Sequence, residues 1–229
     1  MCSSDLWMEN QVSLFVKPPQ PSFPLNPNRQ SWSKWHWHDV VADWNWPGYE
    51  NTEFEVNVYS SCEAAELFLN GKSLGKKETN RTTEFQAMWK VPYQPGELKV
   101  VGYQKGKPVS QAVLATAAET KAIKINADRN KISADNQDLS YITVELTDEK
   151  GIRNPKEERL VKFTIEGEGS IVGVGNANPV STESYRLPQR KAWQGRCLVI
   201  VKSTGKSGKV KLTASAEGLN PVQVEIQSE

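Results

Sequence analysis

The sequence is poor in the residues on which most metal and nucleophilic sites depend. Its 229 residues include only three cysteines and two histidines. Cys2, Cys62 and Cys197 have neither the spacing of a zinc site nor the density of a disulfide framework, so we expect separate free thiols. His36 and His38 would share one face of a strand, but the pattern places no third ligand beside them. The sequence therefore predicts no metal site and no cofactor.

An excess of one charge and long apolar runs are missing as well. Lysine and arginine total 28 against 27 aspartates and glutamates, which leaves a net charge of +1. So balanced a chain lacks the electrostatic footprint of a nucleic-acid or anionic-membrane binder. It also has no run of about 18 apolar residues, the length that a spanning helix needs. Residues 1–7 lack the basic start and apolar core of a signal peptide, so the sequence leaves localisation unassigned.

What the sequence has instead is a hydrophobic period of two. Apolar and polar residues alternate over residues 54–59, which is typical of a half-buried strand. A second strand-like run ends at Asn70-Gly71, a dipeptide that favours the type I′ hairpin turn because both of its central residues need a positive φ. With that turn, Leu67 faces Leu74 and the two leucines lie on one face. The stretch predicts a β-hairpin.

Similar short runs, separated by glycine and proline turns, recur along the rest of the chain. No helix of ordinary length is evident. We therefore predict an all-β fold, with two consecutive immunoglobulin-like β-sandwiches at residues 50–118 and 119–229. An extended Pro/Trp-rich connector, residues 1–49, precedes them. The boundary between the sandwiches is placed near residues 117–121, because the alternation restarts at Ile123.

The connector differs from the rest of the chain in composition. Residues 12–16 predict one short strand, and residues 17–27 contain five prolines. Proline fixes φ and removes a backbone donor, so this part is expected to be extended.

An aromatic cluster then follows, because five of the eight tryptophans fall within residues 32–46. Indoles at this density either pack an interface or stack on the apolar faces of sugars. The candidate carbohydrate contacts are Trp35, Trp37, Trp44 and Trp46. The alternative is that these rings dock the connector onto the first sandwich or onto a neighbouring domain, and we favour docking.

Two aspartates on one loop raise the question of a calcium site. Asp135 and Asp138 lie in a short polar segment between strand-like runs. They lack the dense, regular oxygen spacing of a calcium-binding loop. Capping of backbone N–H groups in the turn is the better interpretation.

Several segments, taken together, resemble a known family. They are Trp44–Gly48, Val56–Ser60, Glu66–Gly75, Ala134–Tyr141, Gly173–Asn176 and Gly195–Leu198. The first three resemble the immunoglobulin-like sandwich that follows the catalytic barrel in family 2 glycoside hydrolases, the β-galactosidase family. The others resemble the next C-terminal sandwich of that family. The resemblance extends from about Trp32 to the end of the sequence.

The resemblance implies a parent enzyme that hydrolyses β-linked sugars, but this chain lacks the means to do so. The family's acid/base glutamate follows an asparagine on a barrel strand, and the chain contains no Asn-Glu dipeptide. A barrel takes about 250 residues, and two sandwiches leave no room for one. A retaining glycosidase also needs two carboxyl groups about 5 Å apart. We assign no catalytic residue.

The predicted function is therefore that of a non-catalytic C-terminal fragment of a β-galactosidase-type glycoside hydrolase. Its partner would be the parent's own catalytic barrel, which the sandwiches would brace, and they could also set oligomer contacts. Sugar would be met through the parent, and no nucleic acid or membrane is expected as a partner. A bacterial parent of this kind would be periplasmic or secreted. Two other functions stay open: a carbohydrate-binding module that uses the tryptophans, and a pair of adhesion or spacer domains.

Overall fold

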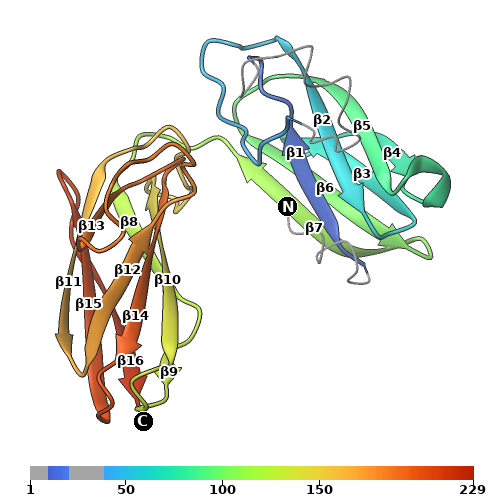
Figure 1. Ribbon diagram of the computed structural model, residues 1–229. Coiled ribbons are helices and arrows are strands. Elements are labelled where there is room, and N and C mark those ends of the chain that lie inside the picture. Colours follow the sequence, from blue (N-terminus) through green and yellow to red (C-terminus); the bar gives the residue numbers. More distant parts are fainter. Residues whose placement is uncertain (1–9, 21–38) are drawn as a thin grey trace, which may run out of the picture. The chain divides into compact units, whose positions relative to one another are not determined.

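The computed structural model describes residues 10–20 and 39–229, and these residues form β-strands and turns. They divide into two compact units, Met1–Thr116 and Ala117–Glu229 (Figure 1). The described helical structure is one short 3-10 helix, η2 (Arg81–Thr83). No helix in the described ranges is long and apolar enough to cross a membrane. The all-β fold class is confirmed.

The first unit is a sandwich of two antiparallel sheets. One has the strand order β1-β2-β5 and the other has the order β4-β3-β6-β7. The strands are β1 (Val12–Val16), β2 (Glu53–Ser60), β3 (Ala64–Leu69), β4 (Lys72–Glu78), β5 (Gln86–Pro92), β6 (Glu97–Gln104) and β7 (Lys107–Ala115).

The core of this unit follows from the alternation in its strands. Phe54, Val56 and Val58 are buried on β2, and they meet buried residues of β3, β5 and β6. Asn70 and Gly71 form the two-residue turn between β3 and β4, as predicted, with φ values of 50° and 80°. Beyond the turn the register shifts between Glu66 and Phe68, so the ladder continues one residue out of step.

The segment that the sequence suggests as a connector takes part in this core. Val12, Leu14 and Val16 are buried on β1, which pairs with β2, so the short strand at residues 12–16 is confirmed. Val16 also forms a backbone bridge to Val41. The described residues before β2 therefore add one strand and one bridge to the first sandwich.

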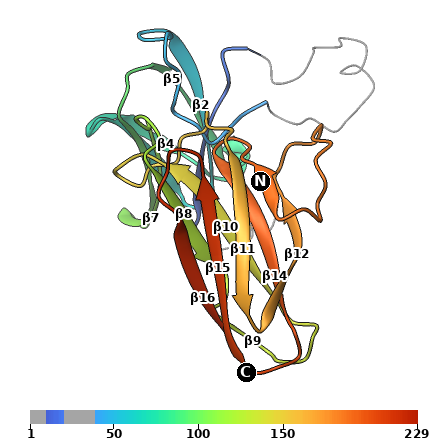
Figure 2. The ribbon, with the colours of Figure 1, turned by 90° about the vertical axis from the view of Figure 1, so that its left-hand side faces the viewer.

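The second unit is also a sandwich. One sheet has the order β12-β14-β10-β8, and the other has the order β13-β11-β15-β16-β9, of which β11, β15 and β16 lie side by side in Figure 2. Only the short β9–β16 pair is parallel among the described ladders. The strands are β8 (Ala122–Ala127), β9 (Lys131–Ile132), β10 (Leu139–Thr147), β11 (Leu160–Gly167), β12 (Gly169–Gly175), β13 (Gln189–Lys191), β14 (Arg196–Ser203), β15 (Gly208–Ala216) and β16 (Val222–Ser228).

The second sandwich's larger sheet has one apolar face, which packs in the core, and one polar face, which lies toward solvent. Val161 and Phe163 on β11, and Val210 and Leu212 on β15, point inward and are buried. The residues between them are polar or charged and lie toward solvent. This alternation of buried and solvent-exposed residues is the pattern that the sequence predicts for an antiparallel sandwich.

Candidate functional site

Trp44 lies inside the first sandwich. Its side chain has no exposed surface, and its indole N–H donates to the Gln94 carbonyl at 3.0 Å. The backbone next to it is held as well, because the Thr116 hydroxyl donates to the Trp44 carbonyl at 2.6 Å. An indole with both ring faces packed and its N–H satisfied is an anchor.

Trp46 joins Trp44 in one group of rings around Phe54. The Trp46 ring stacks on Phe54 at 5.5 Å between centroids, and Trp46 is 8% exposed. Trp44 meets Phe54 edge-on at 6.1 Å and Tyr93 at 5.0 Å. Tyr49 also meets Phe54 edge-on, at 6.1 Å between centroids. The ring group therefore fixes residues 44–49 to the start of β2.

This geometry bears on the four candidate sugar contacts. Trp44 and Trp46 present almost no ring surface to solvent, and stacking on a sugar would need such a surface. Trp35 and Trp37, together with His36 and His38, lie outside the described residues. Carbohydrate contact by the tryptophans stays a prediction.

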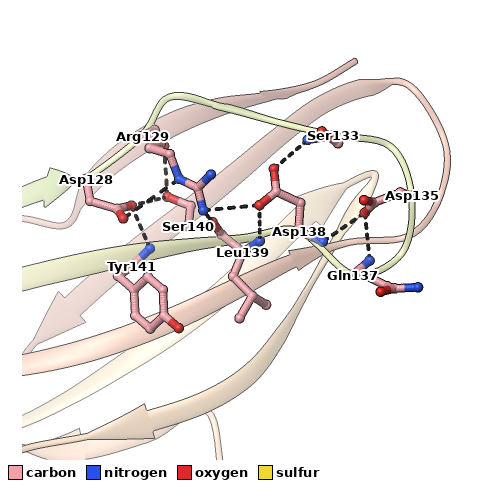
Figure 3. Close-up of polar contacts among 9 residues, drawn as sticks. All are labelled: Asp128, Arg129, Ser133, Asp135, Gln137, Asp138, Leu139, Ser140 and Tyr141. Carbon is pink, nitrogen blue, oxygen red and sulfur yellow. Dashed lines mark hydrogen bonds and ion pairs between the residues drawn. The ribbon is translucent and has the colours of Figure 1, made fainter.

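The loop that holds Asp135 and Asp138 is tied by bonds to backbone N–H groups (Figure 3). The Asp135 carboxylate accepts from Gln137 and Asp138, both at 2.8 Å. The Asp138 carboxylate accepts from Ser133 at 2.8 Å and from Leu139 at 2.9 Å. The carboxylates cap the turn, as the sequence predicts.

The Arg129 side chain also contacts this loop. Arg129 lies 3.1 Å from the Asp138 carboxylate and also donates to the Leu139 carbonyl. Asp128, next to it, accepts from the Tyr141 backbone at 2.8 Å. All three carboxylates accept hydrogen bonds from backbone N–H groups, and the guanidinium lies beside those of Asp128 and Asp138. Nowhere in residues 10–20 and 39–229 do three His, Cys, Asp or Glu side chains gather as metal ligands would.

The chain is similar to known proteins in both of its units. Residues 123–225 match the family described as glycoside hydrolase family 2 C-terminal domain 5, and residues 51–110 match a domain family of unknown function. A β-galactosidase of Bacteroides ovatus is 41% identical over 191 residues, or 83% of this chain. A glycosyl hydrolase family 2 member from Bacteroides cellulosilyticus has a solved structure that matches 99% of this chain, with a TM-score of 0.88 and 48% identity.

This chain belongs to the C-terminal region of the family 2 glycoside hydrolases. It spans 22% of the B. ovatus β-galactosidase and 29% of the B. cellulosilyticus chain. A putative β-glucuronidase of Formosa agariphila is 30% identical over 158 residues, and this chain spans 15% of it. The greater part of each relative therefore lies outside the part that this chain matches.

The catalytic barrel of the family is absent from this chain, whose described residues form sandwiches.

The titratable groups that depart from their usual pKa are engaged in structural contacts. A hydrogen bond from Ser73, which has the largest effect, and a second one from Tyr103 lower the pKa of Glu66. The Tyr103 hydroxyl donates to Glu66 at 2.9 Å, which raises the pKa of that tyrosine. Neither shift brings a group toward the neutral range that acid–base catalysis uses.

The two described cysteines are free and buried, one in each unit, as expected. Burial raises the pKa of the Cys197 thiol to about 12. A nucleophilic cysteine must be a thiolate near neutral pH. Cys197 is therefore a core residue of this family 2 region, and Cys2 lies outside the described residues.

Arg190 has a position that the sequence does not indicate. Its side chain is completely buried, and its guanidinium forms hydrogen bonds with the loop between β12 and β13. It donates to the Glu183 carbonyl at 2.9 Å and to the Asn176 side chain at 3.2 Å, and its guanidinium lies 4.6 Å from the Tyr185 ring centre. An arginine among charged neighbours in the sequence gives no signal of such burial.

Proposed function

We propose that this chain is the non-catalytic C-terminal sandwich pair of a β-galactosidase-type family 2 glycoside hydrolase, in which it braces the catalytic barrel. The observation that supports this is the joint presence of 41% identity to a β-galactosidase and of two β-sandwiches, with no barrel, in the described residues. The partner is the parent's own barrel, and the substrate class of the parent is a terminal β-linked sugar.

The bracing role follows from what the sandwiches offer physically. They are all-β units, each with its own buried core. A folded unit that packs on a barrel stabilises the barrel without contacting substrate, because binding only the folded state shifts the folding equilibrium.

Two measurements test the proposal. The isolated chain should hydrolyse an aryl β-galactoside no faster than a buffer blank, because it lacks the barrel carboxylates. In a hybrid, this chain replaces the matching region of the B. ovatus β-galactosidase. The hybrid should keep activity and melt at a higher temperature than the same enzyme truncated before that region.

Turnover by the repurified isolated chain would contradict the non-catalytic role. A truncated enzyme that is as stable and as active as the hybrid would contradict the bracing role. A hybrid that carries Trp44→Ala serves as a matched control, because it keeps the region's length while it weakens the anchor of the first sandwich.

A further inference from the structure

The turn between β3 and β4 is a chemically reactive pair of residues. An asparagine followed by a glycine is prone to lose its side-chain amide, because the next backbone nitrogen can attack the side-chain carbonyl carbon and glycine has no side chain to hinder it. Asn70-Gly71 is the one Asn-Gly pair in the sequence. Both residues are exposed, and a Cβ added at Gly71 would meet nothing within 4 Å. Solvent therefore reaches the attacking nitrogen.

The Asn70 side-chain amide is held at both ends by the turn that leads into β6. Its oxygen, Oδ1, accepts from the Glu97 N–H at 2.8 Å, and its nitrogen, Nδ2, donates to the Pro95 carbonyl at 3.2 Å. The Asn70 backbone N–H also donates to the Glu97 carbonyl at 2.8 Å. The amide must turn toward the Gly71 nitrogen to react, and that turn gives up both side-chain bonds.

Gly96 packs against the same amide. A Cβ built at Gly96 would lie 1.9 Å from Oδ1 and 2.8 Å from Cγ of Asn70. A larger residue at this position would therefore displace the Asn70 side chain, because packed interiors leave no room for the extra atom. The absence of a side chain at Gly96 is thus what lets the Pro95–Glu97 turn hold the amide.

We propose that Asn70 is a site of self-modification, and that its contacts with residues 95–97 restrain the reaction in the folded chain. The Gly71 nitrogen loses its proton to solvent base and forms a bond to Asn70 Cγ. The bond from Cγ to Nδ2 breaks, Nδ2 takes a proton and leaves as ammonia, and a succinimide ring remains. Water then opens the ring at either carbonyl, which gives aspartate or isoaspartate. The net reaction consumes one water and releases one ammonia, and it does not depend on the proposed bracing of a barrel.

The product would loosen the hairpin that it forms in. An aspartate at position 70 can still accept from the Glu97 N–H, but it cannot donate to the Pro95 carbonyl and brings a negative charge to that oxygen. Isoaspartate also adds one carbon to the main chain of a two-residue turn, which changes the register that the turn sets. Leu69, next to the turn, pairs with Leu98 of β6, so the change reaches the centre of the sheet.

The first test follows the reaction in the full chain, folded and in guanidinium chloride, at one mildly alkaline pH. Trypsin releases Asn70 within the peptide Trp35–Lys72, and fragmentation mass spectrometry locates the change in mass. In the unfolded chain, Asn70 should react before the other three asparagines of that peptide. In the folded chain it should react at least about tenfold more slowly, because two hydrogen bonds must be given up together.

Two variants test whether the Pro95–Glu97 turn is the restraint. Gly96→Ala displaces the Asn70 side chain, and Glu97→Pro removes the N–H that donates to it, at the first residue of β6, where a strand tolerates proline. Each should speed the folded-state reaction by about fivefold. Gly106→Ala is the matched control for strain, because Gly106 also has a positive φ, of 75°, and nothing lies within 4 Å of its added Cβ. Circular dichroism shows whether each variant is folded.

The effect of the product is tested with Asn70→Asp. This variant should melt at a lower temperature than the parent chain, because the bond to Pro95 is lost. Asn51→Asp serves as the matched control, since Asn51 is also exposed and has a φ of 64°. It adds the same charge in the same unit and should lower the melting temperature less.

A folded chain that reacts as fast as the unfolded one, or faster, would overturn the proposal, because the Glu97 N–H would then activate the amide carbonyl rather than restrain it. An unfolded chain that keeps its Asn70 amide would overturn the assignment of the site. If Gly96→Ala and Glu97→Pro react no faster than Gly106→Ala, the restraint lies elsewhere. Equal melting temperatures for Asn70→Asp and Asn51→Asp would contradict the loosening of the hairpin.

Discussion

At the scale of single residues, Gly71 shows a conformational demand that the sequence makes visible. Its φ of 80° is unfavourable for a β-branched residue, and an added Cβ would meet nothing within 4 Å. Gly71→Val should therefore lose about 1–3 kcal/mol of unfolding free energy through backbone strain alone. Gly71→Asn, which tolerates positive φ, should lose much less. Urea midpoints compare the two, and an unchanged midpoint for Gly71→Val would contradict the strain argument.

Asn70, its neighbour, has a second role that no local pattern reveals. Its side chain accepts from the Glu97 N–H at 2.8 Å and donates to the Pro95 carbonyl at 3.2 Å. A Cβ on Gly96 would lie 1.9 Å from this side-chain oxygen. The turn at Asn70 is predictable from two adjacent residues. The hydrogen bonds from the Asn70 side chain to the turn at Pro95 and Glu97 are not predictable in this way, because these partners are more than twenty residues away in the sequence.

Asp138 links the capping loop to pH. Backbone bonds from Ser133 and Leu139, and the nearby Arg129, hold the pKa of Asp138 below its usual value although burial opposes them. A folded pKa below the unfolded one, about 3.9, means that this stability is complete above that pH and is lost as the pH falls through the folded pKa.

Asp138→Asn should therefore lower stability at neutral pH and flatten the decline of stability below about pH 4. Urea midpoints across this range measure the effect. Glu149→Gln, an exposed carboxylate on a turn of the same unit, controls for the loss of one charge. If both variants decline in acid as the parent chain does, the capping carboxylate is not the group that titrates.

At the scale of elements, the segment from residue 39 to residue 49 is tied to the first sandwich by its aromatic anchors. Trp44 is fully buried among Phe54 and Tyr93, so Trp44→Ala should cost about 3–5 kcal/mol. Tryptophan emission should not change when a β-galactoside is added. Urea unfolding and fluorescence titration measure these effects, and Trp35→Ala and Trp37→Ala serve as comparisons.

The carbohydrate alternative makes the opposite forecast for the same experiment. Saturable quenching by sugar, lost in a Trp44→Ala chain that remains as stable as the parent, would contradict the anchoring role. Quenching that is lost only in Trp35→Ala or Trp37→Ala would assign sugar contact to those two residues.

Elements with a regular alternation are predictable, and those that pair through context are not. Residues 142–146 and 210–214 alternate cleanly and lie in β10 and β15. Strand β12, with three glycines and a bulge at Val172, has no such pattern and is fixed by its ladder to β14. The two-residue β9 exists because β16 passes beside it. Such strands follow from tertiary pairing, which overrides local preference.

At the scale of the whole molecule, the chain carries two separate cores. The buried apolar residues of Met1–Thr116 form one cluster, and those of Ala117–Glu229 form another. The sequence places a boundary nearby because hydrophobic alternation stops and restarts there. The sequence also predicts a strand at residues 12–16 and favours docking of Trp44 and Trp46. It does not specify their partners on β2 and around Tyr93, because those partners are distant in sequence.

Separate cores predict separate folding. A chain of residues 117–229 should fold alone and unfold in one cooperative transition, because about 100 residues suffice for a sandwich of this type. Trp193 is its only tryptophan, so emission reports this unit without interference. Its urea transition by fluorescence should coincide with the transition by circular dichroism at β-sheet wavelengths. Phe163→Ala removes a buried core ring and should shift both transitions together by about 3–5 kcal/mol. If the shorter chain lacks β-sheet circular dichroism, or if its two transitions separate, the second sandwich depends on the first for its core.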